Sequence, residues 1–224
     1  MRGKVKRPYR STRRREQAGE TRHRIIRAAH DLFVSQGYGR TTIAEIAGAA
    51  GVAVETVYAA FRNKPTLLRQ VWYATIRGDE HDIRLLDRPE IRAVLAEPDL
   101  ATRLRAHAVA LTPVFRRITP LLRALQGATT SEPAAAAMLA EFDERRLDAA
   151  GHYARAAAAT GQLGVSEQEC SDLLAATMEG GLWYRLVEEC GWSEERFAQV
   201  LGTMWVAALV SSGPVHDGSR RAGA

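Results

Sequence analysis

Apolar residues recur at helical spacing along most of the chain, most clearly in two short segments separated by a glycine. The first segment has apolar residues at i, i+3, i+4 and i+7: Ile43, Ile46, Ala47 and Ala50. Gly51 follows, and glycine tolerates the left-handed conformation in which helices often end. The second segment runs from Val54 to Phe61. A helix, a glycine-containing turn and a second helix that enters the DNA major groove make up the helix-turn-helix, so residues 42–61 predict DNA binding.

The remainder of the chain is also predicted to be helical. Upstream, apolar residues at 25, 29, 32 and 33 indicate an amphipathic helix that ends near Gly37. From Thr66 to Ser212 no alternating β-branched run occurs, so we expect an all-α fold without a sheet. A break is expected near Pro120, and either a kink or a break at Pro113.

The last two predicted helices indicate self-association. Gly180 and Gly181 fall in the middle of the first of them, where close helix packing or a kink beside a cavity would compensate for the weak helix propensity of glycine. The second helix, Ser193–Ser211, is apolar on all sides from Met204 onward, so one side is expected to pack on its own domain and the other on a partner subunit. The residues predicted at this dimer interface are Gly180, Gly181, Met204, Trp205, Ala208 and Leu209.

Charge is distributed unevenly along the 224 residues. Residues 1–27 hold eleven Lys or Arg and two Glu, a charge of +9, so the rest of the chain carries −4 of the net +5. We expect residues 1–19 to be a basic, disordered arm, with Arg13, Arg14 and Arg15 contacting DNA phosphates. The alternative is a solvated tail that only aids solubility.

Several function classes find no support in the sequence. No apolar run approaches the ~20 residues of a membrane span, and no apolar segment follows the basic amino terminus as in a secretory signal. Cys170 and Cys190 lack the spacing of a zinc site and are interpreted as structural thiols in a reducing compartment. No Ser-His-Asp order, paired carboxylate motif or phosphate loop appears. We therefore expect a cytoplasmic protein that is not an enzyme and has no cofactor, metal or membrane partner.

A series of short motifs runs through residues 20–70: Thr21–Ile26, Ala28-Ala29, Leu32-Phe33, Gly37-Tyr38, Thr42-Ile43, Ile46-Ala47, Ala50–Val52, Thr56–Tyr58, Phe61, Asn63-Lys64 and Leu67-Leu68. In their order and spacing, these motifs resemble the TetR family of one-component bacterial regulators. One departure is Ala53, because the family usually has Ser or Thr at this cap of the recognition helix. A missing side-chain cap typically costs ~1 kcal/mol.

The resemblance and the residues together suggest a DNA-contact set. Val54, Glu55, Thr56 and Ala59, which the internal core does not need, are free to face the groove, with Ala53 at the helix start. Thr56 suits a thymine methyl or a base edge, whereas Glu55 either accepts from a cytosine or pairs with an arginine. The resemblance implies phosphate contacts for Thr42, Tyr58 and Lys64.

The resemblance further implies a homodimer joined through its last two helices, and an effector pocket inside the carboxy-terminal helices. The candidate lining residues are Trp72, Phe115, Met138, Phe142, Tyr153, Met178, Trp183 and Tyr184, although each is individually more often plain core. His107 and His152 are further polar candidates, although a lone histidine is usually structural or exposed.

These expectations combine into one hypothesis. Residues 20–66 form a helix-turn-helix domain, 67–212 a helical effector-binding and dimerisation domain, and 213–224 a flexible tail. The dimer represses by occupying a palindromic double-stranded DNA operator and is released by a small-molecule effector. The alternatives are an activator of the same fold, and an all-α enzyme or ligand-binding protein whose helix-turn-helix is vestigial.

Overall fold

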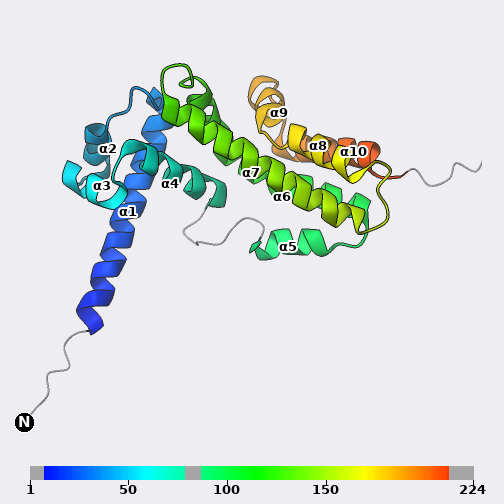
Figure 1. Cartoon of the computed structure of the whole chain (residues 1–224), viewed down its shortest axis with the longest axis horizontal. Coiled ribbons are helices and arrows are strands. Elements are labelled where there is room, and N and C mark those ends of the chain that lie inside the picture. Colours follow the sequence, from blue (N-terminus) through cyan, green and yellow to red (C-terminus); the bar gives the residue numbers. More distant parts are fainter. Residues whose placement is uncertain (1–7, 79–86, 212–224) are drawn as a thin grey trace, which may run out of the picture. The chain divides into compact units, whose positions relative to one another are not determined.

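The computed structural model describes residues 8–78 and 87–211, with the backbone alone for residues 8–15. Helices make up nearly all of the regular structure in these ranges, with one isolated antiparallel bridge between Leu163 and Val210 (Figure 1). The elements are α1 (Pro8–Gln36), α2 (Ile43–Ala50), α3 (Val54–Phe61), α4 (Lys64–Arg77), α5 (Pro89–Ala96), α6 (Leu100–Gln126), α7 (Pro133–Ala158), α8 (Glu167–Thr177), α9 (Gly181–Trp183), the π-helix η2 (Tyr184–Glu189) and α10 (Glu194–Leu209). The predicted all-α class is confirmed.

The amino-terminal helix is longer than the sequence pattern predicted. Because α1 begins at Pro8, the prediction that the basic arm is disordered up to residue 19 is wrong for residues 8–19. Pro8 occupies the first helical position, where a missing N–H is tolerated, and no proline follows before Gln36. Residues 1–7 and the predicted tail 213–224 lie outside the described residues.

The chain divides into two compact units. Unit 1 comprises residues 1–82 and 117–142, and unit 2 comprises residues 83–116 and 143–224. The division falls within α6 and again within α7, so each of these helices contributes to both units. The functional boundaries predicted at 66/67 and 212/213 remain predictions.

The first four helices of unit 1 enclose a small core. The residues of these helices that are almost wholly buried are Ile25, Ala29, Phe33, Ile46, Ala47, Val57, Phe61, Leu67, Leu68, Val71 and Trp72. Tyr38, in the turn after α1, packs edge-on against Phe33 with 5.1 Å between ring centroids. Burying each large apolar side chain stabilises the fold by ~1.5–3 kcal/mol, which holds the short helices α2 and α3 in place.

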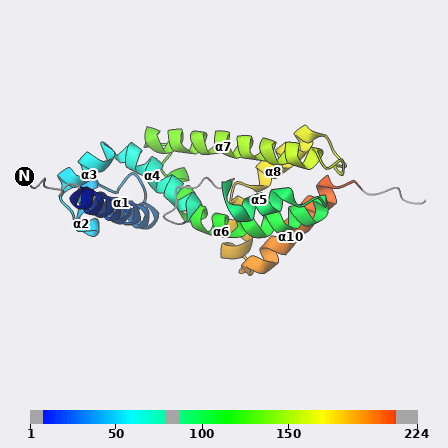
Figure 2. The ribbon, with the colours of Figure 1, turned by 90° about the horizontal axis from the view of Figure 1, so that it is seen from below.

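In unit 2, α10 packs closely on the unit 2 part of α6, and Figure 2 shows the two helices together. At Gly202 a Cβ atom would lie 3.0 Å from the Cα atom of Arg105, so a larger residue would require the two helices to move apart. The indole of Trp205 donates to the Thr177 hydroxyl over 2.8 Å, and both Trp205 and Leu209 are buried within the chain itself. On the side of α10 that carries Trp205, the apolar residues therefore pack into the core of unit 2 itself.

Two expectations about helix continuity are corrected. Gly180 does not lie within a helix: α8 ends at Thr177, and Gly180 adopts φ +85°, a left-handed conformation that separates α8 from α9. Conversely, α6 continues through Pro113 and Pro120, so the expected break near Pro120 is wrong. The proline rings are accommodated because apolar residues along α6, such as Leu111, Phe115 and Leu122, are buried and anchor it on both sides.

Candidate nucleic-acid interface

Local capping fixes the first helix of the helix-turn-helix. The Thr42 side chain accepts a hydrogen bond from the Glu45 backbone N–H, and the Glu45 carboxylate in turn accepts from the Thr42 N–H at 2.7 Å. These hydrogen bonds from Thr42 hold the pKa of Glu45 below its usual range. At the other end, Gly51 has φ +65°, the left-handed ending that the sequence predicted.

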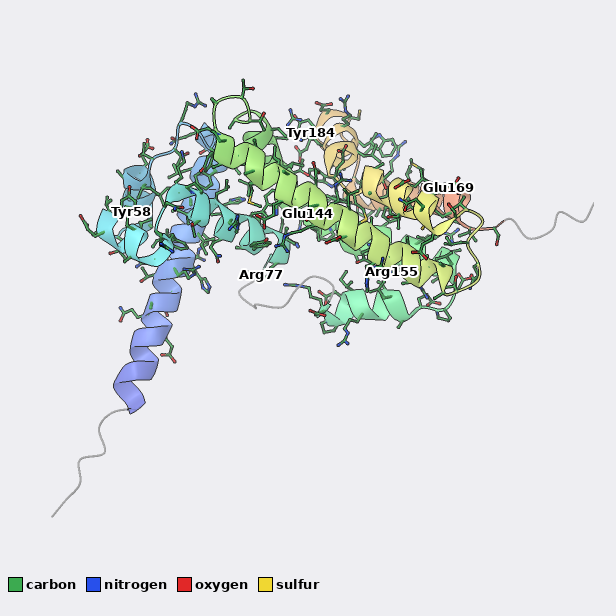
Figure 3. The ribbon with its side chains drawn as sticks, viewed as in Figure 1. Tyr58, Arg77, Glu144, Arg155, Glu169 and Tyr184 are labelled. Atoms are coloured by element: carbon green, nitrogen blue, oxygen red, sulfur yellow. The ribbon has the colours of Figure 1, made fainter. Side chains whose placement is uncertain are left out.

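The recognition helix α3 presents most of the predicted DNA-contact residues to solvent. Ala53 caps α3 without a side-chain hydrogen bond, in keeping with the absence of Ser or Thr there. Ala53, Glu55 and Ala59 are exposed, and Val54 and Thr56 are half-buried. Tyr58 is 48% exposed on α3 (Figure 3), which is unusual for a large aromatic side chain inside a packed three-helix unit.

Arg22 of α1 fastens the carboxyl end of α3, a role that the apolar pattern did not reveal. Its guanidinium donates to the carbonyl of Ala60 at 3.1 Å and to the side chain of Gln70 in α4 at 2.9 Å. The same group lies 4.4 Å from the centroid of the Phe61 ring. One side chain thus links α1, α3 and α4.

A very tight turn joins α3 to α4. Arg62 has φ +62° and ψ −45°, and the Asn63 N–H donates to the Phe61 carbonyl over 2.7 Å, which closes a three-residue turn. Such a backbone in a residue other than glycine is strained by ~1–3 kcal/mol and persists only where the surroundings hold it. Arg62 and Arg40, in the turn before α2, are exposed cations that our predicted contact set omitted.

Two of the predicted phosphate contacts already have partners within the protein. Thr42 is engaged with Glu45, as described above. The Lys64 ammonium donates to the Gly39 carbonyl at 3.3 Å and lies 4.2 Å from the centroid of the Tyr38 ring. Burial lowers the pKa of Lys64, and the carboxylates of Glu132 and Glu45 oppose that shift.

Helix α4 is held to the parts of α6 and α7 that belong to unit 1. Glu141 of α7 accepts from the Tyr73 hydroxyl at 2.6 Å and from Arg69 at 3.1 Å. Arg117 of α6 donates to the carbonyls of Thr75 and Ile76 at the end of α4, each at 3.1 Å. The helix that follows the helix-turn-helix is therefore tied to its neighbours by charged hydrogen bonds.

The predicted effector-lining residues are distributed over both units. Trp72, Met138 and Phe142 belong to unit 1, where the Trp72 and Phe142 rings meet edge-on at 4.8 Å. Those of unit 2 are Phe115, Tyr153, Met178, Trp183 and Tyr184, and among them Met178 and Tyr184 are only half-buried.

A few buried polar atoms stand out among these side chains. Within the part of the chain that the structure describes, Trp72 Nε1, Tyr153 Oη and Trp183 Nε1 are buried without a hydrogen-bond partner. His107 Nε2 shares this property, and its ring lies 3.8 Å from that of Tyr153 and 5.4 Å from that of Trp205. Burial lowers the pKa of His107 from 6.5 to about 3, so the imidazole is neutral near pH 7. His152 is exposed.

The predicted dimer residues also separate by exposure. Met204 is 47% exposed and Ala208 is exposed, whereas Trp205 and Leu209 are buried within the chain and so are not available to a partner. Gly180 is buried and Gly181 half-buried. A partner would therefore meet the Met204 side of α10.

Other site types find little support in residues 8–78 and 87–211. No group of three or more His, Cys, Asp or Glu side chains is placed there to hold a metal ion. Cys170 is buried and Cys190 exposed, both as free thiols. No helix in these ranges is by itself long and apolar enough to cross a membrane; α2 and α3 pass that test only as a pair, which is bent by 106°.

Comparison with known proteins identifies the segment that contains α2 and α3, residues 25–71, which we call the head. Residues 25–71 match the family model of "Bacterial regulatory proteins, tetR family". Residues 25–71 thus form a TetR-family domain. The prediction made from its motifs is thus confirmed, and the match spans the part of α1 from Ile25 onward, α2, α3 and the part of α4 up to Val71. A family of regulatory proteins also agrees with the prediction that this chain is not an enzyme.

Sequence similarity is concentrated in the TetR-family head. The transcriptional regulator TtgR of Pseudomonas putida is 46% identical over 57 residues, which are 25% of this chain and 27% of TtgR. AcrR of Shigella flexneri is 40% identical over 58 residues. The matched region thus covers about a quarter of these relatives' length.

Structural similarity extends further along the chain. SmeT, the repressor of the multidrug efflux pump SmeDEF of Stenotrophomonas maltophilia, superimposes with a TM-score of 0.61 at 22% identity, covering 87% of this chain and 94% of SmeT. A regulator from Saccharomonospora viridis, solved with choline, gives a TM-score of 0.64 at 19% identity and covers 86% of this chain and 98% of that one. At such identities the likeness establishes the TetR-family fold.

Proposed function

We propose that this protein is a DNA-binding transcriptional regulator that represses by occupying a palindromic operator. The observation that carries the proposal is the exposed face of α3, the second helix of the family's helix-turn-helix, with Glu55, Thr56 and Tyr58 on an anchored frame. Basic residues concentrated before this head would attract the phosphates. An activator would use the same fold. A regulator of this kind would act in the cytoplasm, where bacterial DNA lies.

An electrophoretic mobility shift on the DNA upstream of the gene tests this function. We expect a shifted complex that survives excess random DNA. Thr56→Ala should change the preference among operator variants by several-fold, because one base-edge contact contributes about 1 kcal/mol. Thr102→Ala is the matched control: it makes the same side-chain change at an exposed position of α6 in unit 2, away from α3, and should leave that preference unchanged. If no upstream DNA is retarded, the protein is instead a ligand-binding protein with a vestigial head.

We infer that the regulator acts as a homodimer through the Met204 side of α10. The support is a large apolar side chain, 47% exposed beside the exposed Ala208, on a helix whose opposite side is core. Met204→Glu should yield monomers in sedimentation velocity at micromolar concentration and weaken operator binding by at least about tenfold, because two half-sites are no longer bound together. Ala93→Glu, which adds the same charge at an exposed position of α5, should remain dimeric. A monomeric wild type would contradict the dimer.

We further infer that a small-molecule effector binds among the carboxy-terminal helices and releases the operator. The buried polar atoms without partners at Tyr153 and His107 in unit 2 support this, because a ligand that hydrogen-bonds there would satisfy them. Two structural neighbours were solved with small molecules: SmeT in complex with triclosan, and the S. viridis regulator in complex with choline. A thermal-stabilisation screen followed by an operator-release assay would identify the effector.

A further inference from the structure

Lys64, the predicted phosphate ligand at the start of α4, is surrounded by groups of its own chain. Its ammonium donates to the Gly39 carbonyl at 3.3 Å and lies over the Tyr38 ring at 4.2 Å. The side chain is half-buried, so part of its hydration shell has been replaced by these groups. A DNA phosphate that approaches Lys64 must therefore compete with partners that are already present.

An acidic residue from a distant part of the sequence adds to this environment. Glu132 belongs to the turn between α6 and α7, directly before Pro133. Its carboxylate passes over the backbone of Gly39: a Cβ atom on Gly39 would lie 3.3 Å from Glu132 Oε1. The same carboxylate acts on Tyr38 and Lys64, which both lie next to Gly39. Burial, and to a lesser extent the Glu132 charge, raises the pKa of Tyr38 to about 12. Burial lowers the pKa of Lys64, and the Glu132 charge opposes that shift.

We propose that Glu132 opposes phosphate binding at Lys64 and thereby restrains the DNA affinity of the head. In the free protein its negative charge balances the ammonium. When a phosphate reaches Lys64, the carboxylate and the phosphate become like charges near one cation, and that repulsion weakens the complex. This inference rests on the proposed DNA-binding function and adds an autoinhibitory contact to it.

The position of Glu132 in the fold gives this contact a regulatory use. The turn that carries Glu132 joins α6 and α7, and both helices also supply residues to unit 2. A change in the packing of these helices that moves the turn would alter the distance between Glu132 and Lys64. The DNA affinity of the head would change with it, without any contact between an effector and the DNA-binding residues.

Fluorescence anisotropy with a short labelled duplex of random sequence tests the proposal, because a phosphate contact does not depend on base sequence. At low salt, Glu132→Gln should tighten binding about two- to fivefold, the range of a partly exposed charge pair. The slope of log affinity against log salt should steepen by up to ~0.9 if Lys64 gains a full phosphate contact. Glu144→Gln is the matched control: it makes the same charge change at an exposed site of α7 in unit 2 (Figure 3) and should have little effect.

The Lys64→Met background makes the test specific. There, Glu132→Gln should no longer change the affinity, because the cation for which the two anions compete is gone. If wild type binds the duplex, Lys64→Met weakens binding and Glu132→Gln leaves it unchanged or weaker, the inference is overturned while the proposed function stands. If wild type binds neither random nor upstream duplex, the proposed function itself fails and the inference with it.

Discussion

His107→Phe should remove much of the acid sensitivity of the folded protein. His107 is buried between the rings of Tyr153 and Trp205, and burial lowers its pKa from 6.5 to about 3. Between these two values the unfolded chain binds a proton that the folded chain does not. The free energy of unfolding therefore falls as the pH drops below 6.5, by up to about 1.4 kcal/mol per pH unit. Above pH 6.5 this contribution to stability is fully present.

Denaturant unfolding at pH 7.5 and pH 5 measures the effect. Three of the four tryptophans, Trp183, Trp192 and Trp205, belong to unit 2, so their fluorescence follows the unit that contains His107. Wild type should lose about 2 kcal/mol more than His107→Phe between the two pH values. His107→Gln separates loss of the titrating group from any change in packing, and His152→Gln, at an exposed site on α7, should behave as wild type. Equal losses in wild type and both His107 variants would contradict the prediction.

Deleting residues 2–15 should weaken binding to every duplex by at least about tenfold near physiological salt, because eight Lys or Arg are lost. The plot of log affinity against log salt should flatten by ~0.9 for each phosphate contact removed. The melting temperature should hardly change, since Ile25 is the first buried side chain among those described in α1, and the shortened helix keeps residues 16–24 ahead of it.

A full-length variant with the eight cations replaced by Gln is the control for this deletion. It should reproduce the loss of affinity and of salt dependence, because charge is the active property of the segment. An unchanged salt slope in both variants would leave the segment as a solubility element. A large fall in melting temperature would show that the segment packs on the domain.

The parts that sequence predicted well are those governed by neighbours a few residues apart. The spacing of Ile46, Ala47 and Ala50 and the glycine at 51 defined the helix-turn-helix, because periodicity and the left-handed ending are local properties. The disordered arm was mispredicted because charge was weighed above helix propensity in residues 8–19.

The parts that it missed depend on contacts between distant residues. Arg22 meets Ala60 across 38 positions and Tyr73 meets Glu141 across 68, and no periodic pattern encodes such pairs. The interface prediction failed at Trp205 for a related reason: an apolar helix can be surrounded by its own domain, and periodicity does not distinguish this from a partner. Glu132 likewise lies beside Gly39 only because the fold brings these distant residues together.

The way α3 is fastened has a consequence for protein engineering. Its carboxyl end is held by Arg22 and by the three-residue turn at Arg62, while Glu55 and Ala59 face outward and take no part in that fastening. The orientation of α3 is therefore set by residues other than those that face outward, and the outward residues can be exchanged independently. Replacing the outward-facing residues of α3 with those of another regulator should transfer that regulator's DNA sequence preference without changing the orientation of the helix. Substituting Arg22 or Arg62, by contrast, should loosen α3 and weaken discrimination between DNA sequences at all contacted base pairs.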